Sequence, residues 1–150
     1  KTHPATMPDV FEAGTMNVPS FAGLAAGCAY IEQYGIDNIH SYLSELRRYF
    51  IESLASVPSV RVYAPNAKKA GPVVGVNIND IPSSEVSRLL DEQYRIATRP
   101  GAHCAPLVHK ALRTEAQGIV RFSFSTFNTK EEIDHAVSAL EAISRMITEI

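Results

Sequence analysis

Ile119-Val120-Arg121-Phe122-Ser123-Phe124-Ser125-Thr126 is the stretch that most clearly predicts how this chain folds. Large apolar side chains alternate with smaller or polar ones, which is the pattern of a half-buried β-strand. Val120, Phe122 and Phe124 are expected to face the core. Arg121 is therefore expected on the opposite face, where a ligand could bind. The alternative is that Arg121 is simply an exposed residue of the sheet.

A helix is expected directly after this strand. Thr129 and Glu132 have the spacing of a capping box, and apolar residues recur at helical spacing from Ile133 to Ile147. The same reasoning predicts helices over 19–34, 37–57, 82–93 and 106–112, and strands over 60–64, 73–79 and 94–99. Cys28 lies on the apolar stripe of the first helix and is expected in the core.

The order of these elements predicts the fold class. Four strands and four or five helices, with a helix between most strands, indicate an α/β (α+β) fold: a small sheet of about four strands covered by helices. Residues 1–18 carry Pro4, Pro8 and an isolated Gly14. They are expected to form an irregular segment ahead of one domain at 19–150.

Composition excludes several classes of protein. The 150 residues are 45% apolar and 20% charged with a net charge of −2, as in an ordinary globular domain, and no basic run indicates a nucleic-acid partner. Two distant cysteines make no disulfide framework, and no Cys/His cluster has metal-ligand spacing. No apolar run is long enough for a membrane span, and no secretory signal is seen. A reducing, cytoplasmic setting is expected.

A second stretch is the candidate for chemistry: Arg99-Pro100-Gly101-Ala102-His103-Cys104-Ala105-Pro106. It follows a predicted strand and precedes a predicted helix. Pro100 fixes its own φ and Gly101 tolerates a positive φ, so the segment can present one sulfur in a defined place. A free cysteine is, however, often just a small buried hydrophobe. The segment alone does not decide between these readings.

Three motifs in order carry a resemblance to a known family. Arg99 to His109 resembles the nucleophilic-cysteine loop of pyridoxal-phosphate (PLP) cysteine desulfurases, within the class V aminotransferase family: Arg-x-Gly-x-His-Cys-Ala-x-x-(Leu/Val)-His. Phe11 to Asn17 resembles that family's Phe-Glu-Ala-Gly-Thr-x-Asn segment. Arg121 to Glu132 resembles its Arg-x-Ser-x-x-x-(Tyr/Phe)-Asn-Thr-x-Glu-Glu segment. The resemblance covers nearly the whole chain and implies the mostly antiparallel small domain of a fold-type I PLP enzyme.

The resemblance also implies roles for individual residues. Cys104 would be the nucleophile that takes sulfur from L-cysteine as a persulfide, leaving L-alanine. Arg121 would bind the substrate carboxylate, because a guanidinium offers paired donors to two oxygens. Arg99 and His103 would support the site, although His103 could equally be structural. In a homodimer, Gly14 and Thr15 would reach the cofactor phosphate of the partner subunit.

The residues that would hold PLP covalently are not found in this sequence. No lysine lies in a context that matches the family's Schiff-base lysine, so a larger PLP-binding domain is expected upstream of Lys1 and the fragment alone is expected to be inactive. Ala102 stands where many desulfurases have a second His, which keeps selenocysteine and other substrates open. Two rivals remain: a single-cysteine redox or binding module without PLP, and a degenerate homologue kept as an interaction partner. A sulfur-acceptor protein is a further expected partner.

Overall fold

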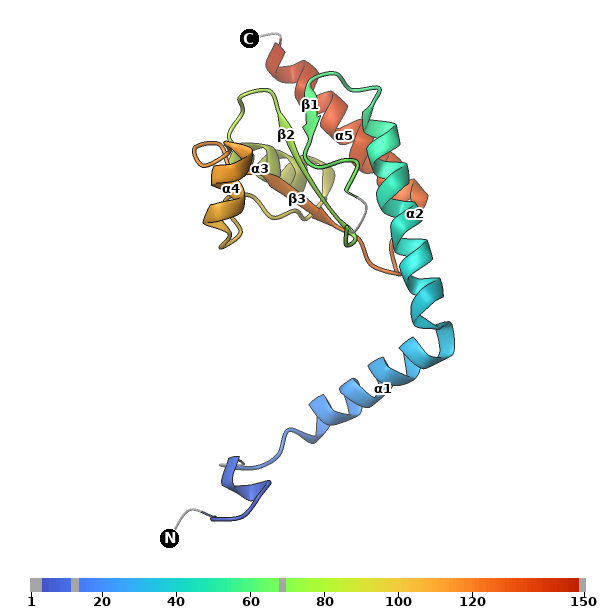
Figure 1. Cartoon of the computed structure of the whole chain (residues 1–150). Helices are drawn as coiled ribbons and strands as arrows, with labels where there is room; N and C mark the ends of the chain where they lie inside the picture. Colours follow the sequence, from blue (N-terminus) through green and yellow to red (C-terminus); the bar gives the residue numbers. More distant parts are fainter. Residues whose placement is uncertain (1–3, 12–13, 68–69, 149–150) are drawn as a thin grey trace. The chain divides into compact units, whose positions relative to one another are not determined.

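The computed structural model describes residues 4–11, 14–67 and 70–148, with only the backbone given for 147 and 148. Ile147, which belongs to the predicted stripe of the last helix, therefore has no described side chain. The chain divides into two compact units, Lys1–Ile39 and His40–Ile150 (Figure 1). The predicted division between 1–18 and 19–150 stays a prediction.

The first unit consists mainly of one helix. A 3-10 turn, η1 (Asp9–Phe11), precedes α1 (Val18–Tyr34). The Asn17 side chain accepts a hydrogen bond from the Ser20 amide at 3.2 Å, which satisfies a free donor at the start of the helix. Gly35, with φ of 78°, ends α1 as expected.

The prediction that one apolar stripe of α1 is buried in the core is wrong. Every residue of α1 is exposed except the half-buried Tyr30, and Cys28 is exposed with the rest. Two physical reasons account for this. Apolar residues and glycines are spread around the helix rather than gathered on one face. Among its described residues, the first unit also has no second long element that could cover them.

An antiparallel sheet forms the centre of the second unit. Its strands are β1 (Val60–Val62), β2 (Val73–Ile78) and β3 (Val120–Ser123), in the order β1-β2-β3. Both pairings are antiparallel, and Gly75 lies opposite Arg121 in the register. The predicted class, a small antiparallel sheet covered by helices, is confirmed.

The sheet has three strands among the described residues, and the fourth predicted strand, over 94–99, is wrong. Tyr94 still belongs to α3 (Ser83–Tyr94), and Arg95 closes that helix in the left-handed conformation with φ of 59°. Only Arg99 pairs with the sheet, as an isolated bridge to Arg121. Past Arg99 the Gly101 carbonyl still accepts from the Ile119 amide, but the Gly101 amide donates to Ser83 Oγ instead of to β3, so the ladder does not continue.

The core lies on one face of the sheet. Residues of α2 (Ile36–Leu54), α3 and α5 (Lys130–Thr148) pack against alternate strand residues, and α4 (Pro106–Leu112) lies on the other side (Figure 1). This burial supplies most of the stabilisation of the unit. Its fully buried side chains include Leu46, Phe50, Val76, Ile78, Val86, Leu90, Val120, Ile133, Leu140 and Ile143.

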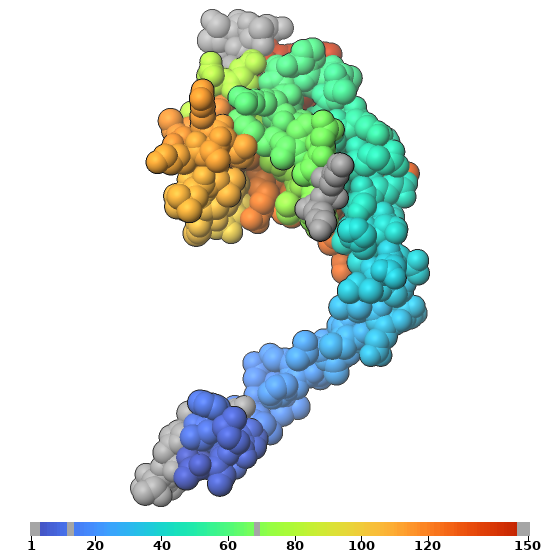
Figure 2. Space-filling view, in the orientation of Figure 1, coloured from blue at the N-terminus to red at the C-terminus, as the bar shows by residue number. Residues whose placement is uncertain are grey.

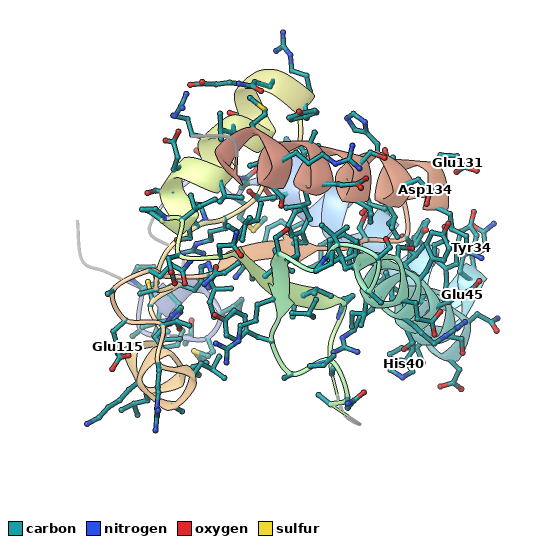
Figure 3. The ribbon with its side chains drawn as sticks, turned by 90° about the horizontal axis from the view of Figure 1, so that it is seen from above. Tyr34, His40, Glu45, Glu115, Glu131 and Asp134 are labelled. Carbon is teal, nitrogen blue, oxygen red and sulfur yellow. The ribbon has the colours of Figure 1, made fainter. Side chains whose placement is uncertain are left out.

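Polar contacts fix α5 against α2. The Tyr49 hydroxyl donates to Asp134 Oδ1 at 2.7 Å, and Lys130 Nζ lies 2.6 Å from Glu45 Oε1. The bond to the Glu45 carboxylate raises the pKa of Lys130 and lowers that of Glu45. Figure 3 shows Glu45 and Asp134 on the same side of this unit, with Glu115, beyond α4, on the opposite side.

The predicted capping box at the start of α5 is confirmed. The Glu132 amide donates to Thr129 Oγ1 at 3.3 Å, and the Thr129 amide donates to Glu132 Oε2 at 3.1 Å. Asn128 extends it, because its Nδ2 also donates to Glu132 at 2.9 Å. The bonds that the Glu132 carboxylate accepts from Asn128 and from the Thr129 amide lower the pKa of Glu132.

Within the part of the chain that is described, no helix combines the length and the apolarity needed to cross a bilayer.

Candidate functional site

A cavity of about 320 Å³ lies between α4 and the sheet. Its sheet side is formed by Val73, Gly75 and Arg121, which alternate with core-facing residues and so point away from the packed helices. The helix side is formed by α4, which Figure 2 shows at the surface in orange. The polar side chains around the cavity are Arg47, Tyr63, His103, His109 and Arg121.

The loop that carries Cys104 is anchored to the start of β3. Arg99 and Arg121 exchange two main-chain hydrogen bonds, of 3.2 and 2.9 Å, and the Ile119 amide donates to the Gly101 carbonyl at 3.2 Å. The Gly101 amide in turn donates to the buried hydroxyl of Ser83 at 3.1 Å. Arg99 therefore contributes through its main chain, while its side chain is exposed.

Gly118 allows this close approach and was not singled out from the sequence. It has φ of +70°, and a Cβ there would lie 2.4 Å from Ser83 Oγ and 2.8 Å from Gly101 Cα. Both distances are too short for any side chain. The only signal in the sequence is a glycine directly before a strong strand, which is not specific.

Asn77 and Gln117 are two further polar residues that sequence reasoning missed. Asn77 is buried, and its Nδ2 donates to Gln117 Oε1 at 2.9 Å and to the Gly118 carbonyl at 2.8 Å. Gln117 Nε2 reaches the carbonyls of Asn79 and Ile81, both at 2.8 Å. This network fixes the turn into β3. Its sequence signal is a lone Asn inside an apolar strand.

His103 and Cys104 both adopt the left-handed conformation, with φ of 52° and 58°. Each such residue costs roughly 1–2 kcal/mol unless it is glycine. A pair of them persists only when the surrounding structure determines it. The outcome is an exposed, unpaired Cys104 thiol two residues before the first residue of α4.

The imidazole of His103 is directed to the main chain of Arg99. Its Nε2 lies 2.8 Å from the Arg99 carbonyl oxygen. A carbonyl can only accept, so Nε2 carries the proton and Nδ1 is the bare nitrogen of the neutral ring. The half-buried His103 also lines the cavity, so it connects Cys104 to that space.

Arg121 is positioned to receive an acceptor. Its side chain is half-buried in the cavity wall, and its Nε is buried without a hydrogen-bond partner. Arg47 also lines the cavity and its Nε is likewise buried without a partner, but its terminal nitrogens already donate to the carbonyls of Ala64 and Pro65. A buried donor without a partner is costly, and an anionic ligand in the cavity would satisfy it.

Gly14 and Thr15 lie in the first unit, in an exposed bend. Glu12 and Ala13 of the same motif lie outside the described residues. A glycine amide and a threonine hydroxyl are phosphate donors, and both residues are accessible. They fit a phosphate-binding role, and their use in one stays a prediction.

Among the residues that the structure describes, no group of three His, Cys, Asp or Glu side chains could hold a metal ion.

The sequence model of the aminotransferase class-V family matches residues 1–136. The chain belongs to this family. A relative from Synechocystis sp., a probable cysteine desulfurase, is 34% identical over 145 residues, which is 95% of this chain and 34% of the relative. A probable cysteine desulfurase from Staphylococcus aureus is 34% identical over 137 residues, 91% of this chain and 32% of the relative.

Solved structures agree. The apo cysteine desulfurase of Thermococcus onnurineus NA1 has a TM-score of 0.80 and 35% identity, covering 92% of this chain and 34% of that one. The cysteine desulfurase CsdA of Escherichia coli has a TM-score of 0.77 and 29% identity, and the match covers 93% of this chain and 33% of that one. A C-DES variant with glycine covalently linked to its PLP cofactor has a TM-score of 0.68 and 21% identity, and the match covers 91% of this chain and 32% of that one. At this low identity the similarity shows the fold alone. The chain thus spans about a third of the length of its relatives.

Proposed function

We propose that this chain is the C-terminal part of a PLP-dependent cysteine desulfurase that converts L-cysteine to L-alanine. One observation carries the proposal: the exposed free cysteine Cys104 lies between His103 and Ala105, which line a cavity in which Arg121 offers a buried donor without a partner. A thiol acceptor for sulfur and a cation for the carboxylate are the two protein groups that this reaction needs from this part of the chain. The similarity to desulfurases supports the same assignment.

Each residue has a defined task in this proposal. Arg121 binds the substrate carboxylate and so orients the substrate sulfur. The Cys104 thiolate attacks that sulfur: an S–S bond forms, and the Cβ–S bond breaks with its electron pair left on the substrate, which takes up a proton as alanine forms. Cys104 is left as a persulfide. His103 and Arg99 are supporting residues: the His103 ring is held on the Arg99 carbonyl, which fixes the loop that presents the Cys104 thiol.

Gly14 and Thr15 are the residues of this chain that would hold the cofactor, through its phosphate. When bound, PLP supplies the electron sink that makes the Cβ–S bond labile. The proposal also includes three features of the whole protein: it forms a homodimer, it passes the persulfide sulfur to an acceptor protein, and it works in a reducing, cytoplasmic compartment. Free thiols at both cysteines fit such a compartment.

The test is sulfide release from L-cysteine by the full-length protein. Cys104→Ala is expected to abolish release while the bound cofactor keeps its visible absorbance. Cys28→Ala is the matched control, because Cys28 is also an exposed thiol. Release that survives Cys104→Ala would remove Cys104 from the reaction.

A further inference from the structure

His109 is a buried histidine that the proposed reaction does not use. It is only 2% exposed, yet it lines the same cavity as Arg121. Its Nδ1 lies 2.9 Å from Oγ1 of Thr114, which is also buried. The Thr114 amide donates to the His109 carbonyl at 2.9 Å. The pair therefore closes the end of α4 through side chain and main chain together.

The His109 ring also contacts the ring of His103. The two centroids are 5.6 Å apart and the planes are inclined by 60°, an edge-on arrangement. His103 is held at its other end by the Arg99 carbonyl. The contacts thus run from Thr114, beyond α4, through two imidazoles to Arg99. Cys104 lies on the loop between the two ends of this series.

We propose that His109 and Thr114 are positioning residues for Cys104. They hold the His103 ring, and with it the left-handed backbone of His103 and Cys104, in the arrangement that presents the thiol. Such a backbone needs support from its surroundings, and His103 gives that support only while its own ring is fixed. The inference rests on the proposed function in taking Cys104 as the reacting thiol.

Several charged or titratable groups surround this loop. They come from the loop itself, α4, β3, α2 and the chain after β1: Arg99, His103, His109, Lys110, Arg121, Arg47 and Tyr63. A variant that changed any of these charges would shift thiol reactivity directly. Thr114 is uncharged, so altering its hydroxyl removes none of these groups, and its effect on Cys104 passes through the contact with His109 Nδ1.

The experiment measures the rate at which iodoacetamide alkylates Cys104 across a range of pH. It uses the full-length protein and follows the Cys104 peptide by mass spectrometry. Thr114→Val keeps the side-chain shape but removes the hydroxyl. We expect it to shift the midpoint of the pH profile and to change the neutral-pH rate about fivefold, the size expected for one lost neutral hydrogen bond. Thr114→Ser keeps a hydroxyl and is expected to follow the parent profile.

Ser59→Ala is the matched control. It removes the side-chain hydrogen bond to Ser144, and neither residue lines the cavity. We expect it to leave the alkylation profile unchanged. If Thr114→Val does not fold, Thr114→Ala replaces it. It also removes the hydroxyl that contacts His109 Nδ1 and removes no titratable group, so the same shift is expected.

A Thr114→Val profile that superposes on the parent profile overturns the inference, and so does an equal change in Ser59→Ala. Alkylation requires no substrate turnover. Its outcome is therefore independent of the sulfide-release test, in which failure of the proposed function would appear as release unaffected by Cys104→Ala.

Discussion

Arg99 and Arg121 are joined by two main-chain hydrogen bonds, with N–O distances of 3.2 and 2.9 Å. This pair attaches the start of the Cys104 loop to the strand that carries the candidate carboxylate-binding guanidinium. The two functional elements, far apart in sequence, thereby have a fixed relation. Sequence motifs identify the elements, and the bridge explains how they share one cavity.

Gly118→Ala should destabilise the protein, because the new Cβ would overlap Ser83 Oγ and Gly101 Cα at a positive φ. We expect a loss of at least about 2 kcal/mol from backbone strain and overpacking. Thermal melting of the full-length protein measures it. Gly71→Ala is the control, since a Cβ there meets nothing within 4 Å. Equal melting temperatures for the two variants would contradict the packing described for the loop.

Arg121→Lys should weaken substrate binding while the fold is retained. Lysine keeps the charge but loses the planar paired donors, so KM for L-cysteine is expected to rise about tenfold or more, the worth of a charge-assisted hydrogen bond. Steady-state kinetics on the full-length enzyme measure this. Arg47→Lys is the comparison, because the terminal nitrogens of Arg47 already donate to main-chain carbonyls. If KM rises in Arg47→Lys but not in Arg121→Lys, the assignment of the substrate carboxylate to Arg121 is wrong.

The first turn of α5 should weaken in acid. Hydrogen bonds from Asn128 and the Thr129 amide lower the pKa of Glu132 below its usual 4.5. A carboxylate with a lowered pKa stabilises the fold above its unfolded value, and this contribution is lost as the pH falls from 4.5 through the folded pKa. Amide-exchange protection of residues 130–134 is expected to fall in that window.

Glu132→Gln tests the cause of this acid dependence. Glutamine also serves at this position of a capping box but carries no charge. Protection of the same amides is therefore expected to be lower at neutral pH and to fall less below pH 4.5 than in the parent, with the remaining fall due to Glu131, whose pKa is also lowered. If the variant keeps the full acid-induced loss, another group is responsible for it.

The sequence predicted correctly those elements whose formation depends on residues close together in the chain. The alternation around Phe122 predicted β3, Pro106 marked the start of α4, and Thr129 with Glu132 predicted the cap of α5. Each depends on residues only a few positions apart. The helix predicted after the Cys104 loop is also confirmed, whereas the strand predicted before the loop is reduced to the single bridge at Arg99.

The wrong or missing predictions concern contacts that an element makes with other parts of the chain. Cys28 lies among apolar residues at helical spacing, but burial also requires a covering partner, which the sequence of one helix does not specify. The stretch over 94–99 contains β-compatible residues, but the left-handed Arg95 interrupts it, and the Gly101 amide donates to Ser83 Oγ instead of to β3, so only Arg99 forms a bridge. The contacts of Gly118 with Gly101 and of His109 with Thr114 form only on folding.

The most direct test of the account follows the sulfur itself. The full-length protein is mixed with a stoichiometric amount of L-cysteine, quenched, and its cysteine peptides are analysed by mass spectrometry. The account predicts one added sulfur atom on the Cys104 peptide and none on the Cys28 peptide. Alanine formed with Cys104 unmodified, or sulfur found on Cys28, would contradict it.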